Sequence, residues 1–305
     1  MQDYPPIAEH GLIGDLQTAA LVTTDGSIDW YCCPRFDSPT VFGSLLDSSR
    51  GGHFRIRPTD DGYVVKQLYL PDTAGLITRF VTEHGVGELL DFMPPTRRVG
   101  SDNHRLVRLI RCVRGRISLS VDIAPRFDYG RQPHETHITE HGAVFTTPVL
   151  TLTLHTVRDQ DNERHAQVST TASGDVHVIF ELRAGQQRGL VLESAASGPP
   201  RDIANAEFDR LLEETSGFWR SWLAQSTYTG RWREALQRSA ITLKLMTYAP
   251  TGALVAAPTA GLPEQVGGER NWDYRYTWVR DGSFSVYALR GMGFEVEVQR
   301  KDDQS

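Results

Sequence analysis

The sequence predicts a β-plus-α chain: an N-terminal antiparallel β-sandwich over the first two-thirds and helices in the last third. Three observations support this prediction. Apolar and polar residues alternate with period two from residue 51 to about 195, turn signals separate these runs, and a helical period begins at about Ala204. The Gly-Pro-Pro sequence at 198–200 marks the boundary between the two parts.

The alternating runs have the pattern of strands with one buried face. The clearest are Ile117, Leu119, Val121 and Ile123; Leu150, Leu152 and Leu154; and Val176, Val178, Phe180 and Leu182. The turn signals between the runs are Asp61-Gly62, His84-Gly85, His141-Gly142 and Ser173-Gly174. Turns of this composition join neighbouring strands, so they favour antiparallel hairpins over βαβ units.

Three helices are expected after the boundary. The first begins at about Ala204, and its apolar face is formed by Phe208, Leu211, Leu212, Thr215, Trp219, Trp222 and Leu223. The second covers about Arg231 to Tyr248 and ends at Ala249-Pro250; its apolar face carries Trp232, Leu236, Ala240 and Leu243. The third begins between Asp281 and Ser283 and ends near Gly291 or Gly293; it carries Phe284, Tyr287 and Ala288.

The composition is that of a globular protein, with 305 residues of which 39% are hydrophobic and 23% charged. The net charge is −6 and the arginines are dispersed, so nucleic acid is not an expected partner. No apolar stretch is long enough to span a membrane, and the first residues do not resemble a signal peptide, so a cytoplasmic location is expected. The three cysteines, Cys32, Cys33 and Cys112, form no disulfide or metal-ligand pattern and are expected to be reduced and structural.

The segment from Asn271 to Asp281 has the chemistry of a carbohydrate-binding surface. It contains the aromatic residues Trp272, Tyr274, Tyr276 and Trp278, the arginines Arg275 and Arg280, and the aspartates Asp273 and Asp281. Flat apolar rings beside guanidinium donors and carboxylate acceptors suit a polyhydroxylated ligand. The segment leads into the third predicted helix.

The predicted helices leave apolar faces that the hydrophilic tail 295–305 does not cover. Two interpretations remain open. The helices pack on the sandwich and on a partner, or they are the front portion of a larger helical domain.

Several motifs resemble glycoside hydrolase family 15, the glucoamylase, glucodextranase and trehalase family, and especially its bacterial trehalase-like members. In the N-terminal part they are Ile13-Gly14-Asp15, the runs 18–22 and 25–30, and Pro34-Arg35-Phe36-Asp37-Ser38-Pro39; in the C-terminal part they are the runs 248–254, 257–259, 262–264 and 268–281. The resemblance implies a β-sandwich domain at 1–198, a helical linker at 199–229, and at 230–305 the first helices of an (α/α)6 barrel. It also implies hydrolysis of trehalose or a short α-glucoside with inversion, and no cofactor.

The family pattern Tyr-x-Tyr-x-Trp-x-Arg-Asp falls on the segment that ends at Asp281. The resemblance implies that Arg280 and Asp281 hold hydroxyls of the glucose unit that is cleaved and that Tyr274 and Trp278 line its pocket. A guanidinium beside a carboxylate can donate to one sugar hydroxyl and accept from its neighbour. The alternative is an ordinary ion pair at a helix start, where acidic residues are favoured.

No residue is predicted to be catalytic. The family uses two carboxylates, one that protonates the leaving oxygen and one that activates water. Glu264, Glu269 and Asp273 do not fall at the corresponding motif positions, so the acid and base are expected beyond Ser305 and the chain is expected to be truncated. The alternative is a non-catalytic carbohydrate-binding or interaction protein, and its oligomeric state stays open.

Three further features have two interpretations each. Trp272 and Tyr276 either pack beneath the loop or contact the ligand. Asp37 either reaches the barrel mouth or caps its own turn, and the second is favoured. The sequence from His137 to His141 fits the H-x-x-E-H metalloprotease pattern, but its β-branched residues and Gly142 favour a solvated hairpin with no metal.

Overall fold

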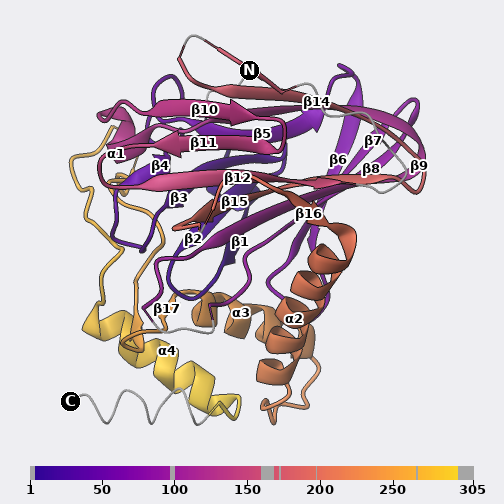
Figure 1. The fold of residues 1–305 in the computed structure, drawn as a ribbon. Coiled ribbons are helices and arrows are strands. Elements are labelled where there is room, and N and C mark those ends of the chain that lie inside the picture. Colours follow the sequence, from indigo (N-terminus) through magenta and orange to yellow (C-terminus); the bar gives the residue numbers. More distant parts are fainter. Residues whose placement is uncertain are drawn as a thin grey trace.

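The computed structural model describes residues 4–96, 100–158, 168–171, 173–196, 198–265 and 267–294. Two mostly antiparallel sheets form the N-terminal part (Figure 1). The strands of the first sheet are β1 (His10–Gly14), β2 (Ala19–Thr23), β3 (Ser27–Cys32), β4 (Thr40–Phe42), β5 (His53–Pro58), β13 (Val168–Thr170) and β14 (Val176–Arg183). Those of the second are β6 (Tyr63–Tyr69), β7 (Leu76–Thr82), β8 (Gly85–Phe92), β10 (Glu135–Thr139), β11 (Gly142–Thr146), β12 (Thr151–Arg158), β15 (Gln187–Ser194) and β16 (Asp202–Ala204).

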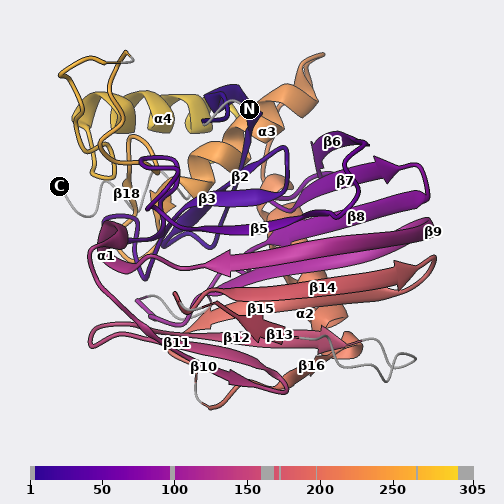
Figure 2. The same cartoon turned by 90° about the horizontal axis from the view of Figure 1, so that it is seen from above.

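Strand β9 (Arg105–Ala124) belongs to both sheets. Its first half pairs with β8 and β15, and its second half pairs with β5 and β14. Strand β9 passes from one sheet to the other at Gly115, which has a φ of 69°. A Cβ there would lie 2.1 Å from the carbonyl oxygen of His84, so only glycine fits this turn of the strand. The long shared strand therefore joins the two sheets into one body (Figure 2).

The core lies between the two sheets. Leu119 and Val121 from the second half of β9 and Leu106 and Ile110 from its first half are all at most 1% exposed and belong to one apolar cluster. The alternating pattern of the sequence therefore places the predicted apolar residues inward, and the prediction of a mostly antiparallel N-terminal part is confirmed.

The turn predictions are confirmed at three positions and wrong at one. His84-Gly85, His141-Gly142 and Ser173-Gly174 each lie at a hairpin between paired strands. Asp61-Gly62 instead connects β5 with β6, which lie in different sheets and do not pair. A Gly-containing turn sequence shows only that the chain changes direction. Which strand then pairs with which depends on the packing of the core. The strands of residues 10–42 were not predicted, because β2 and β3 are buried on both faces and do not alternate.

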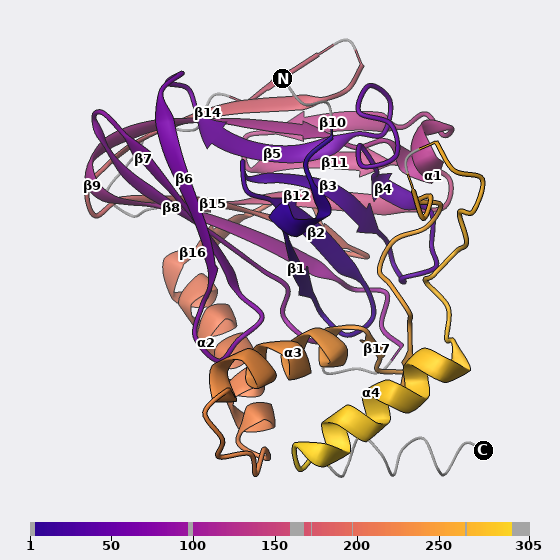
Figure 3. The same ribbon diagram turned by 180° about the vertical axis from the view of Figure 1, so that it is seen from behind.

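Two short helical turns lie within the N-terminal part, η1 (Ile7–Glu9) and α1 (Phe127–Gly130), and three longer helices follow the sheets: α2 (Asn205–Leu223), α3 (Arg233–Leu245) and α4 (Val279–Gly291). A two-stranded hairpin, β17 (Thr247–Tyr248) and β18 (Ala253–Leu254), lies between α3 and α4. The three helices lie together at one end of the sheets (Figure 3).

Helix α2 links the sheets to the other helices. Its first half packs Phe208 and Leu211 against the second sheet, and Phe208 contacts Phe92 at a centroid distance of 5.7 Å. Its second half forms a separate cluster with α3 and the end of α4, in which Trp222 stacks on Phe294 at 4.3 Å. The predicted apolar face of α2 is therefore confirmed.

The other two helix predictions need correction. The second helix ends at Leu245 rather than Tyr248, because Thr247 and Tyr248 pair with β18, and Trp232 lies outside it and is 59% exposed. The third begins at Val279, and the predicted aromatic residues Phe284 and Tyr287 are 69% and 79% exposed. Helix α4 instead packs through Ser285 and Leu289.

Candidate functional site

The aromatic segment 271–278 is held against the chain that follows β18. Isolated bridges pair Val255 with Thr277 and Ala260 with Asp273. The amides of Ala257 and Ala256 donate to the carbonyl oxygens of Tyr274 and Tyr276 at 2.8 and 3.1 Å. These bonds fix the backbone on both sides of a bend at Arg275 and Tyr276.

The bend brings Tyr274 and Trp278 together. Four residues of extended strand span about 13 Å, yet the two rings stack with centroids 5.4 Å apart and planes tilted by 21°. The Arg280 guanidinium lies 5.6 Å from the Trp278 centroid and donates to Asp281 at 3.1 Å. The four predicted substrate-binding residues thus form one cluster, which is called the aromatic–ionic cluster below.

The first turn of α4 supplies the polar half of this cluster. Trp278 is the N-cap residue, and Asp281 lies in the first turn, where the partial positive charge of the helix favours a carboxylate. The side chains of Arg280 and Asp281 are 66% and 31% exposed. The pair is therefore a helix-start ion pair, and it also stays accessible to a ligand.

Arg275 has a structural position, contrary to its grouping with the sugar-binding residues. It is only 6% exposed. Its Nε and Nη2 donate to Asp273 at 3.0 and 2.8 Å, and its Nη1 donates to the carbonyl oxygen of Ser38 at 2.7 Å. The guanidinium donates to all of these partners, so Arg275 joins the aromatic segment to the loop 34–39.

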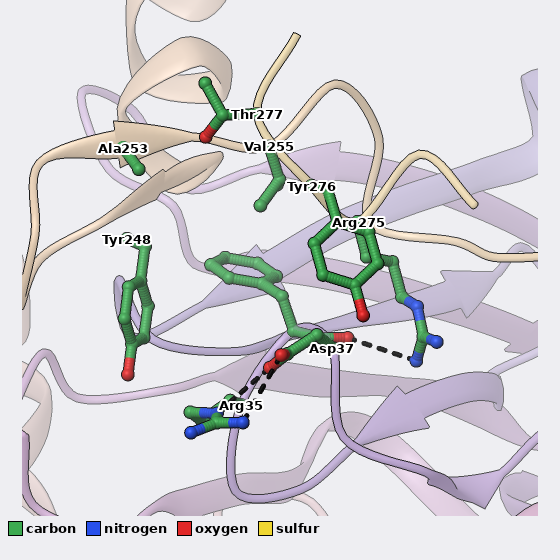
Figure 4. A pocket seen from close by; sticks show the side chains of 9 residues that line it. Arg35, Asp37, Tyr248, Ala253, Val255, Arg275, Tyr276 and Thr277 are labelled. Carbon is green, nitrogen blue, oxygen red and sulfur yellow. Dashed lines mark hydrogen bonds and ion pairs between the residues drawn. The ribbon is translucent and has the colours of Figure 1, made fainter.

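A cavity of about 260 Å³ lies where this loop meets the aromatic segment (Figure 4). Its lining comes from three stretches of chain: Arg35, Phe36 and Asp37; Tyr248, Ala253 and Val255; and Arg275, Tyr276 and Thr277. Tyr248 and Tyr276 stand on either side, and Arg35 and Asp37 lie at one end. We call it the junction cavity.

An ion pair borders the junction cavity. Arg35 Nε and Nη2 donate to the two oxygens of Asp37 at 2.9 and 3.3 Å. The hydrogen bond with Asp37 and its charge raise the pKa of Arg35. Burial raises the pKa of the Tyr248 phenol, which therefore stays protonated at neutral pH and can donate a hydrogen bond.

The structure decides the remaining alternatives at this site. Trp272 and Tyr276 are 57% and 53% exposed, so neither packs in a core beneath the loop. Asp37 does not cap its turn, because the Ser38 hydroxyl accepts from the Arg35 amide at 3.0 Å instead. Neither Arg35 nor Tyr248 had a predicted role. Their only signal was membership of the motifs at 34–39 and 248–254.

The histidine motif lies in a β-hairpin, as predicted. Thr139 pairs with Gly142 across the turn from β10 to β11, so His137 and His141 do not share a helix face. Among the residues described here, no group of three or more His, Cys, Asp or Glu side chains is placed to hold a metal ion. Within the same residues, no helix has the length and apolarity needed to cross a membrane.

Two family models match the chain. Residues 2–205 match "Trehalase-like, N-terminal", and residues 230–305 match "Glycosyl hydrolases family 15". The trehalases of Thermoplasma volcanium and Mycolicibacterium smegmatis are each 35% identical to it, and the matches cover 98% and 97% of this chain and 46% of each relative. The chain therefore spans about half the length of the curated relatives it matches.

A solved structure shares the fold. A bacterial glucoamylase complexed with acarbose superposes with a TM-score of 0.64 at 13% identity, over 99% of this chain and 50% of that one. Together the fold and the family matches place the chain in a glycoside hydrolase family. The chain belongs to glycosyl hydrolases family 15, with a trehalase-like N-terminal region.

Proposed function

We propose that this chain serves the hydrolysis of trehalose or a related short α-glucoside with inversion, and that it supplies substrate-binding residues for that reaction. The aromatic–ionic cluster of Tyr274, Trp278, Arg280 and Asp281 carries the proposal. The trehalases among the relatives and the glucoamylase with the same fold support the substrate class.

The cluster has the two surfaces that a glucose unit needs. The Asp281 carboxylate accepts hydrogen bonds from sugar hydroxyls, and the Arg280 guanidinium keeps donors free beyond the one it gives to Asp281. Each hydrogen bond to a charged group contributes about 1.5–3 kcal/mol. The Trp278 ring offers an apolar face for the C–H surface of the sugar.

The catalytic acid and base are proposed to be absent from these 305 residues. A general acid needs a carboxyl with a raised pKa, and inversion needs a second carboxylate about 6.5–9.5 Å away. Near the cluster, Asp37, Asp273 and Asp281 are each paired with an arginine. Although burial alone raises the pKa of Asp273, its bonds with Arg275 outweigh burial and lower it. None of the three has the environment of a general acid.

The finer architecture is part of the same proposal. We assign residues 1–198 to a β-sandwich domain, 199–229 to a helical linker and 230–305 to the first helices of an (α/α)6 barrel. The family match over 230–305 and the arrangement of α3 and α4 beside the sheets support it. The exposed aromatic residues Phe284 and Tyr287 on α4 agree with a helix that packs against further helices in such a barrel.

The test combines binding with turnover. Calorimetric titration with trehalose and glucose is expected to show binding that Asp281→Asn weakens about tenfold, since one charged hydrogen bond is lost. Asp61→Asn, an exposed aspartate in the turn before β6, is the matched control. An unchanged affinity in Asp281→Asn would remove Asp281 from the site. Release of glucose from trehalose or maltose by the chain would refute the proposed absence of the acid and base.

A non-catalytic binding or interaction protein is the second candidate. The exposed apolar side chains Val279, Phe284 and Tyr287 on α4 favour it, because such a surface promotes association. Light scattering distinguishes the two: a monomer at micromolar concentration argues against an interaction surface on α4.

A further inference from the structure

The junction cavity is not used by the proposed aromatic–ionic cluster. It combines side chains from the first sheet's loop 34–39 with side chains that follow α3, which are more than 200 residues later in the sequence. A cavity assembled from such distant stretches depends on the fold as a whole. Its composition indicates what it can bind.

The walls of the cavity are fixed before any ligand enters. The Phe36 amide donates to the carbonyl oxygen of Gln17 at 3.0 Å, and the Ser38 amide donates to that of Arg35 at 3.1 Å. Phe36 is 3% exposed and meets Tyr248 edge to face at 6.4 Å. Arg275 ties the opposite wall to Ser38. A preformed cavity of this kind loses little entropy on binding.

The charges of the cavity favour a neutral ligand. Arg35 is neutralised by Asp37, and Arg275 is neutralised by Asp273. An anion would approach Arg35 together with the Asp37 carboxylate, so the attraction is offset by repulsion. A neutral polyol has no such conflict, because its hydroxyls can donate to Asp37 and accept from Arg35 and from the phenol of Tyr248.

Size and apolar lining narrow the ligand further. Drug-sized ligands occupy sites of about 300–1,000 Å³, and 260 Å³ suits a smaller molecule such as a single sugar ring. Phe36 and Val255 are 3% and 5% exposed and supply apolar wall for the C–H face of such a ring. The combination of polar end and apolar wall matches a pyranose.

We infer that the junction cavity binds a neutral pyranose, namely the second sugar unit of the short α-glucoside whose first unit is held by the aromatic–ionic cluster. This inference rests on the proposed function. Tyr276 connects the two places, because it lines the cavity and stands two residues from both Tyr274 and Trp278. Two residues span at most about 7 Å of backbone, so the Cα atom of Tyr276 lies within that distance of the Cα atoms of Tyr274 and Trp278. Asp37, Arg35 and Tyr248 thereby become determinants of disaccharide specificity.

The experiment compares a disaccharide with a monosaccharide. Trehalose and glucose are titrated into the chain and into Asp37→Asn, Tyr276→Phe and Asp281→Asn, with Asp61→Asn and Tyr287→Phe as matched exposed controls. Asp37→Asn and Tyr276→Phe are expected to weaken trehalose binding by about tenfold and by a few-fold, and to leave glucose binding unchanged. Asp281→Asn is expected to weaken both. Tyr276→Phe removes only an exposed hydroxyl, so it stays informative even if Asp37→Asn unfolds the loop.

Each outcome decides something. Unchanged trehalose affinity in both cavity variants, with Asp281→Asn still weakened, overturns this inference and leaves the proposed function intact. If Asp37→Asn and Tyr276→Phe weaken trehalose binding while Asp281→Asn does not, the result supports a sugar site in the cavity and overturns the role of Asp281. Binding of inorganic phosphate that Arg35→Gln abolishes, without trehalose binding, overturns the inference in favour of an anion site. Absence of any saccharide binding overturns both.

Discussion

Replacing Arg275 by glutamine tests how the aromatic segment is held in place. The substitution removes the donors to the Ser38 carbonyl at 2.7 Å and to both oxygens of Asp273. Each hydrogen bond to a charged group contributes about 1.5–3 kcal/mol. The Asp273 side chain is 34% exposed and can be rehydrated, so its loss is discounted, whereas the Ser38 carbonyl stays buried beneath the loop. We expect a loss of about 2–4 kcal/mol in the free energy of unfolding.

Urea unfolding measures this loss, with Arg280→Gln as the matched control. Arg280 is a nearby arginine in the first turn of α4, but its side chain is 66% exposed, so its substitution is expected to cost less than about 0.5 kcal/mol. In a trehalose titration both variants are expected to bind more weakly, Arg280→Gln because it loses a proposed ligand contact and Arg275→Gln because the aromatic segment loses its anchor, so stability is what separates them. An Arg275→Gln variant as stable as the parent chain would refute the view that this guanidinium anchors the segment.

The other predictions concern the sheets. Arg108 and Asp91 form a fully buried pair, so Arg108→Met is expected to cost about 3–5 kcal/mol by leaving a carboxylate unpaired. Adding Asp91→Leu is expected to recover part of this loss in the same urea assay, because the carbonyl oxygens of Phe54 and Gly26 also lose their Arg108 donor. Additive losses in the double variant would contradict the pairing. Burial by itself raises the pKa of Glu193, but the contact with His155 at 3.3 Å, the charge of Arg105 and the hydrogen bonds from Asn103 and Arg105 outweigh it and lower the pKa from 4.5 to about 2. A carboxyl with a depressed folded-state pKa stabilises the fold above its unfolded pKa, so this stability is lost as pH falls from about 4.5 to about 2. In Glu193→Gln, the urea midpoint of unfolding should therefore depend less on pH over that range than it does in the parent chain. An unchanged pH dependence would show that the Glu193 carboxylate does not supply this stability.

The local pattern of the sequence predicted the alternating runs that fall on β9, β12 and β14 and the first long helix, because their apolar period follows directly from which face is buried. Phe208 and Trp219 on α2 are both fully buried, as the helical spacing requires. The apolar period gave no correct prediction where an element is buried on both faces or where its apolar residues are exposed. Strand β3 is buried at all six positions and shows no alternation, and the rings of Phe284 and Tyr287 on α4 are exposed although they resemble a core face.

The site was predictable in composition and not in geometry. The cluster of Tyr274, Trp278, Arg280 and Asp281 could be named from the family pattern, but not the bend that stacks the two rings. Arg275 looked equivalent to Arg280, and only burial separates them. One partner of Arg275 is the Ser38 carbonyl, a backbone group 237 residues away that no side-chain motif reveals.

The sheets have a direct part in building the candidate site. The Trp30 indole donates to the carbonyl oxygen of Pro258 at 2.6 Å, the Ala249 amide donates to that of Leu16 at 2.7 Å, and Arg275 reaches Ser38. These bonds lie along the whole stretch from β17 to the aromatic bend. Since a loop of this length has no core of its own, its conformation depends on the sheet that it contacts. A substitution at Trp30 should therefore alter sugar binding without touching the sugar, which distinguishes a supporting sheet from an independent neighbouring domain.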